Sequence, residues 1–318
     1  MLHFASKAPA FVLAREGYDV WLGNNRGCKF SVNHTTLSPE MDAAKFWDFA
    51  FEDMGLKDVP AEIEYIKNVT GVEKVTYLGH SMGATQMVAG LSLMPDYYAA
   101  NLNLFVAFGP ATRLKNTKSV FFRKTAEMLE FFKFLVIDTL HLYNFFEPNF
   151  YDTLLKLQLV KLLPDYFAFQ ARGFDRDPTA NEGGRLKTWV AHTPSGAGYR
   201  NFLHYAQLIN AEQFYRYDYG ATRNYVEYKQ SHPPTYPLAD IKGVPIAIYA
   251  GKEDELADVA DVEWFRDQVK DSVVDYKAYE KIGHLGFVIS KDMSYFSHDV
   301  LPTINKYAKN TTGHLLKI

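Results

Sequence analysis

A serine between two glycines is the feature of this sequence that most clearly indicates chemistry. It lies in KVTYLGHSMGATQM, residues 74–87, where Gly79, Ser81 and Gly83 match the pattern G-x-S-x-G. A serine hydroxyl is a weak nucleophile until a base removes its proton, so the side chain must project toward a histidine. A sharp strand-to-helix turn achieves this, forces unusual backbone angles on the serine and requires small flanking residues, which accounts for both glycines. We therefore predict that Ser81 is a nucleophile and that the Met82 N–H, at the helix start, donates to an oxyanion.

An acid and a base should follow the serine along the chain, in the order Ser, then Asp or Glu, then His. Asp254 follows an apolar run at 244–251, and His284 follows another run at 273–280. Because α/β sheets place their sites at the carboxyl ends of their strands, these two side chains can meet. In that arrangement Asp254 orients His284, and His284 takes the proton from Ser81.

Other acids and histidines leave alternatives open. Glu253 and Asp258 compete with Asp254, although an isolated acidic residue in a loop is usually only solvated. His80 lies beside the serine, where support of the packing is a more ordinary role than proton transfer. Three further histidines lack a preceding strand: His192, His204 and His232. The G-x-S-x-G stretch alone is also compatible with a turn that does no chemistry.

Strands and helices that could position these residues alternate along much of the chain. Apolar runs predict strands at 18–23, 74–79, 102–112, 244–251 and 273–280. Periodic apolar positions and end signals predict helices at 8–16, 44–71, 86–94, 259–270 and 296–309, with Gly17 ending the first and Asp58 capping a helix within the second. This alternation predicts an α/β fold, a mainly parallel sheet with helices on both faces.

The middle of the chain does not follow this alternation. Residues 113–200 are rich in aromatic residues and mostly helical in pattern. We therefore predict a core formed by residues 1–112 and 201–318, with 113–200 inserted as a helical cap or lid.

Composition and charge exclude several classes of protein. The chain has 318 residues, a net charge of −3 and no basic run, so nothing indicates binding to nucleic acid. The single cysteine, Cys28, excludes an internal disulfide and a Cys-based zinc site. The most apolar window, 131–146, contains charged residues and is too short to predict an integral membrane segment. No signal peptide is visible at the start, and three Asn-x-Thr sequons are weak hints of a secretory route: Asn33, Asn68 and Asn310.

The chain also resembles the acid lipase family, which includes gastric lipase, lysosomal acid lipase and the sterol ester hydrolases. The resemblance extends from about residue 10 to about residue 290 and rests on several long motifs. These are GYDVWLGNNRG (17–27), FWDFAFEDM (46–54), DVPAEIEYI (58–66), YLGHSMGATQ (77–86), AHTPSGAGYRNFLHYAQ (191–207), FYRYDYG (214–220), PPTYPL (233–238), AGKEDELADVADV (250–262) and GHLGF (283–287).

The resemblance implies an α/β-hydrolase core with a helical cap and lid. Matched position by position, the family's nucleophile is Ser81, its acid is Asp254 rather than Glu253, and its base is His284. The family's substrates are neutral lipid esters and it uses no cofactor. The same resemblance implies a secreted or lysosomal location and transient contact with a lipid interface.

Three departures from the family pattern affect these expectations. Met82 stands where Gln is usual, but only its backbone N–H is needed, and Gly286 replaces an aspartate beside the base, which loosens the support of that base. A His-Gly-Leu type oxyanion loop should precede residue 8 and is not found. We therefore expect a chain that is truncated at its N-terminus and has no second oxyanion donor. The strand at 18–23 should then lie nearer a sheet edge, and the rate of ester hydrolysis should be reduced about 10²- to 10³-fold.

The leading functional hypothesis is a carboxylic ester hydrolase acting on triacylglycerol or sterol esters. The acyl group would pass to Ser81, and a water deprotonated by His284 would then release the fatty acid. The aromatic block at 121–169 would provide an apolar entry for the acyl chain. Two alternatives remain: a short-chain esterase or thioesterase, and a catalytically weakened lipid-binding relative.

Overall fold

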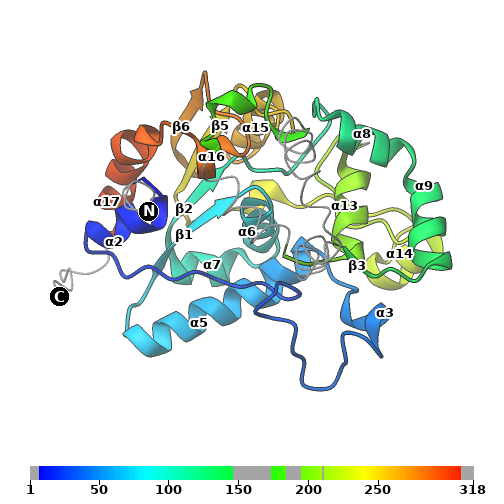
Figure 1. The fold of residues 1–318 in the computed structure, drawn as a ribbon. Helices are drawn as coiled ribbons and strands as arrows, with labels where there is room; N and C mark the ends of the chain where they lie inside the picture. The colour runs from blue at the N-terminus through cyan, green and yellow to red at the C-terminus, as the bar shows by residue number, and fades with distance from the viewer. Residues whose placement is uncertain (1–6, 146–172, 184–194, 210, 309–318) are drawn as a thin grey trace.

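A parallel sheet lies at the centre of the computed structural model, which describes residues 7–145, 173–183, 195–209 and 211–308. Its strands are β1 (Val75–His80), β2 (Leu102–Phe108), β5 (Ile246–Gly251) and β6 (Val273–Tyr279), in the order β1-β2-β5-β6 with every neighbouring pair parallel (Figure 1). These four strands, and the α/β class, confirm the prediction from the sequence.

Helices cover both faces of this sheet (Figure 1). Side chains of β2 alternate between two hydrophobic clusters: Phe105 and Ala107 face one, whereas Leu104 and Val106 face the other. The first cluster packs against α5 (Val59–Thr70), α6 (Met82–Leu93), α7 (Pro95–Asn101) and α15 (Val259–Gln268). The second packs against α2 (Pro9–Arg15), η7 (Phe296–Val300) and α17 (Leu301–Ala308). This double burial explains why the two central strands, β2 and β5, are almost entirely apolar in sequence.

Residues 18–23 do not form the strand that was predicted for them. They have no strand assignment, and Trp21 and Leu22 are exposed, while Tyr18 and Val20 pack partly buried against the second cluster. A strand needs the backbone groups of a neighbour, and within the described part of the chain β1 pairs only with β2. An apolar run indicates burial but does not provide that neighbour.

The long helix predicted at 44–71 is divided, and Asp58 does not cap it. A short helix α3 (Ala43–Phe46) is followed by α4 (Phe51–Asp53), the π-helix η1 (Met54–Asp58) and α5, which run on without a break. Because Asp58 lies inside this continuous helix, with helical φ and ψ of −70° and −54°, its carboxylate is free to accept hydrogen bonds from Arg26 instead (Nε–Oδ1 2.9 Å). Gly55 in η1 lies against α6, where a Cβ would come 2.1 Å from the Gln86 carbonyl oxygen.

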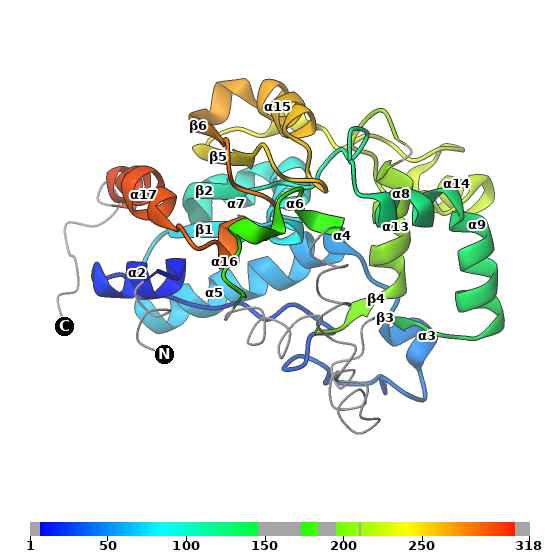
Figure 2. The ribbon, with the colours of Figure 1, turned by 45° about the horizontal axis from the view of Figure 1, so that its top comes forward.

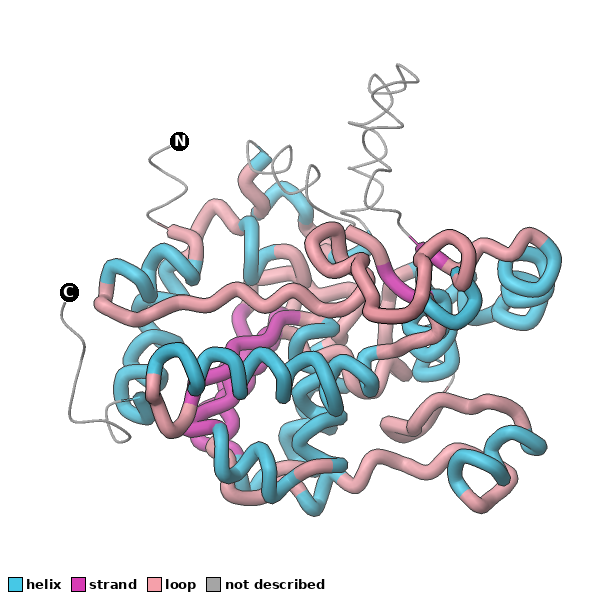
Figure 3. Tube along the Cα trace, turned by 90° about the horizontal axis from the view of Figure 1, so that it is seen from below, coloured by secondary structure: helices cyan, strands magenta, loops and turns pink. Residues whose placement is uncertain are grey.

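A second group of elements lies beside the sheet. It comprises α8 (Val120–Glu127), α9 (Leu129–Phe132), η2 (Lys133–Thr139), the antiparallel pair β3 (Asn144–Phe145) and β4 (Ala197–Gly198), α13 (Tyr199–Ile209) and α14 (Ala221–Tyr228). Figure 3 shows the short β3–β4 pair set apart from the four-stranded sheet. Much of the predicted cap, at 146–172 and 184–194, lies outside the described residues.

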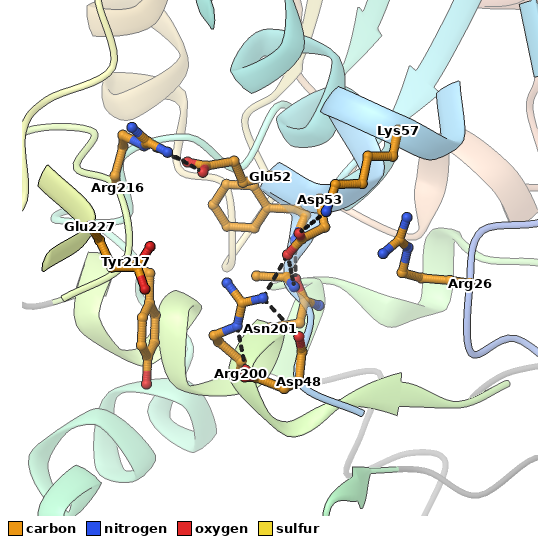
Figure 4. A network of polar contacts seen from close by, with 12 residues as sticks. Arg26, Asp48, Glu52, Asp53, Lys57, Arg200, Asn201, Arg216, Tyr217 and Glu227 are labelled. Carbon is orange, nitrogen blue, oxygen red and sulfur yellow. Dashed lines mark hydrogen bonds and ion pairs between the residues drawn. The ribbon is translucent and has the colours of Figure 1, made fainter. Parts of the chain in front are cut away.

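Ion pairs join this group to the core. Arg200, on α13, donates to Asp48 (Nε–Oδ1 2.6 Å) and to Asp53 on α4 (Nη2–Oδ2 2.7 Å), as Figure 4 shows. Arg216 donates to Glu52, also on α4 (Nε–Oε2 2.8 Å). Arg200 therefore fixes α13 against α4, and Arg216 fixes the segment between α13 and α14 against the same helix. None of the helices in the described ranges is long and apolar enough to cross a membrane.

The remaining elements are short. They are η4 (Pro178–Ala180), η5 (Leu238–Asp240), η6 (Lys270–Ser272) and α16 (Gly286–Ile289). Of the three sequons, those of Asn33 and Asn68 are exposed, and Asn310 lies outside the described residues.

Candidate active site

Ser81 occupies the sharp turn between β1 and α6. Its φ of 55° and ψ of −120° are unusual for a residue with a side chain, as the sequence predicted. The turn is fixed on both sides, because the Ser81 N–H donates to the Phe108 carbonyl (3.0 Å) and the Ser81 carbonyl accepts from Thr85 (3.0 Å). Met82 is the first residue of α6, so its N–H is among the donors without an intrahelical partner.

Only one of the two glycines beside the serine is explained by the space around it. A Cβ at Gly79 would lie 2.6 Å from the carbonyl carbon and oxygen of Gly83 and 2.7 Å from the Ala84 nitrogen. A Cβ at Gly83 would meet nothing closer than the Tyr77 hydroxyl at 3.9 Å. We expected both glycines to be required for close packing, and this expectation is wrong for Gly83. Gly79 must be small because the backbone of Gly83 packs against it.

This difference predicts unequal effects on stability for two matched substitutions. Gly79→Ala should lower the free energy of unfolding by about 1–3 kcal/mol or more, because its new methyl group overlaps backbone atoms that cannot turn away. Gly83→Ala should leave the free energy of unfolding unchanged or raise it by up to roughly 1 kcal/mol, because the new methyl group meets no close atom and alanine has a higher helix propensity than glycine. Urea unfolding of both variants measures these changes. Equal midpoints for the two would contradict this account of the turn.

The structure brings Ser81, His284 and Asp254 together at the carboxyl ends of three strands. His284 Nε2 lies 2.7 Å from Ser81 Oγ, and His284 Nδ1 lies 2.8 Å from Asp254 Oδ2. The other oxygen of Asp254 accepts from the backbone N–H groups of Leu256 (2.9 Å) and Ala257 (2.7 Å). Asp254 and His284 are both 2% exposed, so the hydrogen bond between them is shielded from water, whereas Ser81 is partly exposed.

The electrostatics of the site favour the imidazolium form that proton transfer would create. Burial acts to lower the pKa of His284, but the neighbouring Asp254 carboxylate outweighs it, and the net direction is upward. Gly109 was not among the candidate residues, but it leaves the space in which Asp254 and His284 meet. It follows β2 with φ of +49°, and a Cβ there would lie 3.1 Å from Asp254 Oδ2 and 3.4 Å from His284 Nδ1. The available signal was the Gly109-Pro110 pair near the end of the strand predicted at 102–112.

The two competing acids have other partners. Glu253 forms an ion pair with Arg176 (3.7 Å). Asp258 accepts from the Ala260 N–H (2.9 Å), which caps α15, and pairs with Lys118 (2.6 Å). Neither carboxylate has a hydrogen bond to His284 among the described contacts.

His80 does not face Ser81 as a base. Its Nε2–H donates to the backbone carbonyl of His284 (2.8 Å), and burial lowers the pKa of His80 to about 3, which keeps the ring neutral. His204 is buried elsewhere, with Nε2 bonded to the Tyr215 carbonyl (3.0 Å). His232 is exposed, and His192 lies outside the described residues.

An apolar cavity of about 200 Å³ adjoins Met82, the residue after the serine. Its lining comes largely from α8 and α13 and includes Phe122, Phe202 and Ala206. Asn201 on α13 orders this wall, because its amide accepts from the Phe51 N–H (2.9 Å) and donates to the Met82 sulfur (3.0 Å). Within the described ranges, no group of three or more His, Cys, Asp or Glu residues could hold a metal ion.

A strained serine between strand and helix, hydrogen-bonded to a buried histidine that is itself hydrogen-bonded to a buried aspartate, is the arrangement typical of a serine hydrolase with an α/β-hydrolase fold. Residues 9–98 match the family model described as "alpha/beta hydrolase fold".

Curated relatives give a narrower assignment. The chain is 32% identical to human lipase member K over 95% of this chain and 74% of that relative. It is 33% identical to human gastric triacylglycerol lipase over 89% of this chain and 70% of that relative. It is 31% identical to human lysosomal acid lipase/cholesteryl ester hydrolase, over 96% of this chain and 75% of that relative. The chain belongs to the acid lipase family and is therefore a carboxylic ester hydrolase of the lipase and esterase class.

Proposed function

We propose that Ser81 attacks the carbonyl carbon of a neutral lipid ester while His284 takes its proton and Asp254 orients the histidine. The His284 imidazolium then gives that proton to the leaving alcohol, and an acyl group remains on Ser81. A water deprotonated by His284 releases the fatty acid. The observation that carries this proposal is the continuous hydrogen-bond chain from the partly exposed Ser81 Oγ through the buried His284 to the buried Asp254.

The oxyanion of each tetrahedral intermediate would accept a hydrogen bond from the Met82 N–H at the start of α6. The expectation that this chain supplies no second oxyanion donor also stays a prediction, because residues 1–6 lie outside the described part of the chain. The assignment of the oxyanion site therefore stays a prediction, with Met82 as the donor that the described residues supply.

The substrate class follows from the cavity and from the relatives. Apolar walls beside the reacting serine suit an acyl chain better than a polar substrate. The names of two relatives specify triacylglycerol and cholesteryl esters, and both are neutral lipids of this kind. We infer that the cavity between α8 and α13 holds the acyl chain of such an ester.

Narrowing the cavity should therefore change the preferred acyl length. Ala206→Leu places a larger side chain on the α13 wall, and hydrolysis of p-nitrophenyl decanoate should fall about 10-fold relative to p-nitrophenyl acetate. The same substitution at the exposed Ala221 on α14 is the matched control and should leave the ratio unchanged. The kcat/KM values for the two esters give this ratio. An unchanged ratio in Ala206→Leu would mean that the acyl chain binds elsewhere.

We further propose that residues 113–200 act as a cap whose outer surface contacts a lipid interface transiently. Exposed apolar side chains gather on α8, α9 and η2: Val120, Met128, Phe131, Phe134 and Leu135. Such a surface next to a site for lipid esters suits adsorption to a lipid droplet or micelle. A secreted or lysosomal location fits the gastric and lysosomal relatives.

A further inference from the structure

A short segment from the middle of the chain bridges the loops that carry Asp254 and His284. Phe174 and Arg176 exchange backbone hydrogen bonds with the loop of Asp254: the Glu255 N–H donates to the Phe174 carbonyl (2.9 Å), and the Arg176 N–H donates to the Glu253 carbonyl (2.9 Å). Asp175, between them, forms an isolated antiparallel bridge with Asp254. Figure 2 shows this segment, in green, against α16.

The same segment also contacts His284. The Phe174 ring stacks on the imidazole, with centroids 5.7 Å apart and planes inclined by 16°. Further along, the Glu182 N–H donates to the Ile289 carbonyl (2.8 Å), which fixes the segment to α16. The acid and the base of the site are therefore held by one common support.

Asp175 holds the backbone next to the base through a hydrogen bond. Its Oδ1 accepts from the Leu285 N–H (2.9 Å), the amide that directly follows His284. Its Oδ2 accepts from Asn181 Nδ2 (2.5 Å), and the side chain is 1% exposed. Gly283 makes room for it, because a Cβ at that position would lie 2.5 Å from the Asp175 carboxyl carbon.

The peptide between His284 and Leu285 is consequently held from both sides. Its N–H is bound by Asp175, and its carbonyl oxygen accepts from His80 Nε2 (2.8 Å). Two independent side chains, one from the middle segment and one from the nucleophile turn, thus fix the backbone that aims the imidazole at Ser81.

Asp175 also places a second carboxylate near the imidazole. The titratable groups that face His284 among the described residues are Asp254, Asp175 and His80. Of these, Asp254 raises the pKa of His284 most and Asp175 adds to that effect, while His80 stays neutral. Burial raises the pKa of Asp175 itself to about 6. Arg176, the next residue, is paired with Glu253 and Glu255 and so leaves the Asp175 charge in place.

We propose that Asp175 is a positioning residue for His284, which holds the His284–Leu285 peptide through its carboxylate and stabilises the imidazolium through its negative charge. This inference rests on the proposed role of His284 as the base. It concerns neither Ser81 nor Asp254.

Asp175→Asn separates the charge from the contact. The new amide oxygen can still accept from Leu285, and its NH₂ group can donate to Asn181 Oδ1 once the Asn181 amide, which now presents Nδ2 to Asp175, rotates by half a turn; that Oδ1 is buried and has no hydrogen-bond partner at present. Removing a negative charge disfavours the imidazolium, so the pKa of His284 should fall by roughly one unit. Asp177→Asn is the matched control, since Asp177 lies two residues away, is exposed and accepts from Thr179.

NMR titration of the full chain with ¹³C-labelled histidine measures this pKa directly. The His284 Cε1–H resonance is identified by its absence in His284→Gln. We expect a lower pKa in Asp175→Asn and a wild-type value in Asp177→Asn. In parallel, Asp175→Ala also removes the hydrogen bond to the Leu285 N–H, so it should lower kcat for p-nitrophenyl butyrate about 10-fold or more with little change in KM. Asp175→Asn keeps that hydrogen bond. At a pH above the pKa of His284, its kcat should therefore be close to that of wild type.

The titration tests the role of Asp175, and the hydrolysis assay tests the proposed function, so either claim can be refuted without the other. An imidazole that titrates identically in wild type and in Asp175→Asn would overturn the proposal, whatever the rate of Asp175→Ala. Suppose instead that the pKa of His284 is lower in Asp175→Asn than in wild type, but that the wild-type protein hydrolyses no ester. Asp175 would then remain a positioning residue, and the proposed function would be refuted.

Discussion

Protein carrying Ser81→Ala should unfold at the wild-type temperature and hydrolyse p-nitrophenyl butyrate about 10⁴-fold or more slowly. The reason is chemical, because no acyl-enzyme can form without Oγ, and the hydrogen bond from Ser81 to His284 Nε2 is lost with it. The turn itself should persist, since its backbone bonds to Phe108 and Thr85 do not involve Oγ. Initial rates at saturating ester and a thermal melt measure both quantities.

Ser92→Ala is the matched control for this substitution. Ser92 lies on the same helix, α6, and its Oγ donates to the Ala89 carbonyl (2.9 Å), its one hydrogen bond among the described residues. Its loss should leave the rate within a few-fold of wild type. Undiminished turnover by a folded Ser81→Ala protein would remove Ser81 from the mechanism.

Asp254→Asn should lower kcat about 10⁴-fold. An amide at this position would direct an N–H at His284 Nδ1, so the imidazole would hold its proton on the nitrogen that must accept one from Ser81. The fold should be kept, because the amide oxygen can still accept from the Leu256 and Ala257 N–H groups. Steady-state measurements of kcat for wild type and Asp254→Asn, at a pH above the pKa of His284, give this ratio.

Glu253→Gln is the adjacent, matched control. Its carboxylate faces Arg176 rather than the imidazole, and the surface pair is worth little, so the rate should change less than about threefold. If Glu253→Gln were the crippling substitution and Asp254→Asn were tolerated, the assignment of the acid would be wrong by one residue.

Much of this site could be predicted from residue order alone. The G-x-S-x-G pattern between an apolar run and a helix predicted the strained turn at Ser81, which the φ of 55° confirms. The strand ends near Asp254 and His284 predicted that these side chains could meet, because parallel strands present their carboxyl ends on one edge. Both inferences depend on local pattern and on a general property of parallel sheets.

Contacts between distant segments could not be predicted in this way. The apolar pattern at 18–23 contained no information about a strand partner, and an aspartate at a helix start, Asp58, proved to lie inside a continuous helix. Asp175 is 110 residues from the Leu285 N–H that it binds, and nothing in its surrounding sequence indicates that contact. The roles of Gly109 and His80 likewise depend on side chains that only the folded chain brings near them.

Active-site labelling tests the central claim most directly. The chain should react with a fluorophosphonate, and peptide mass spectrometry should find one phosphonylated residue, Ser81, because that hydroxyl alone is bonded to the buried His284. Labelling should disappear in Ser81→Ala and persist in Ser92→Ala. A folded wild-type chain that remains unlabelled, or one labelled at another residue, would contradict the assignment of Ser81 as the nucleophile.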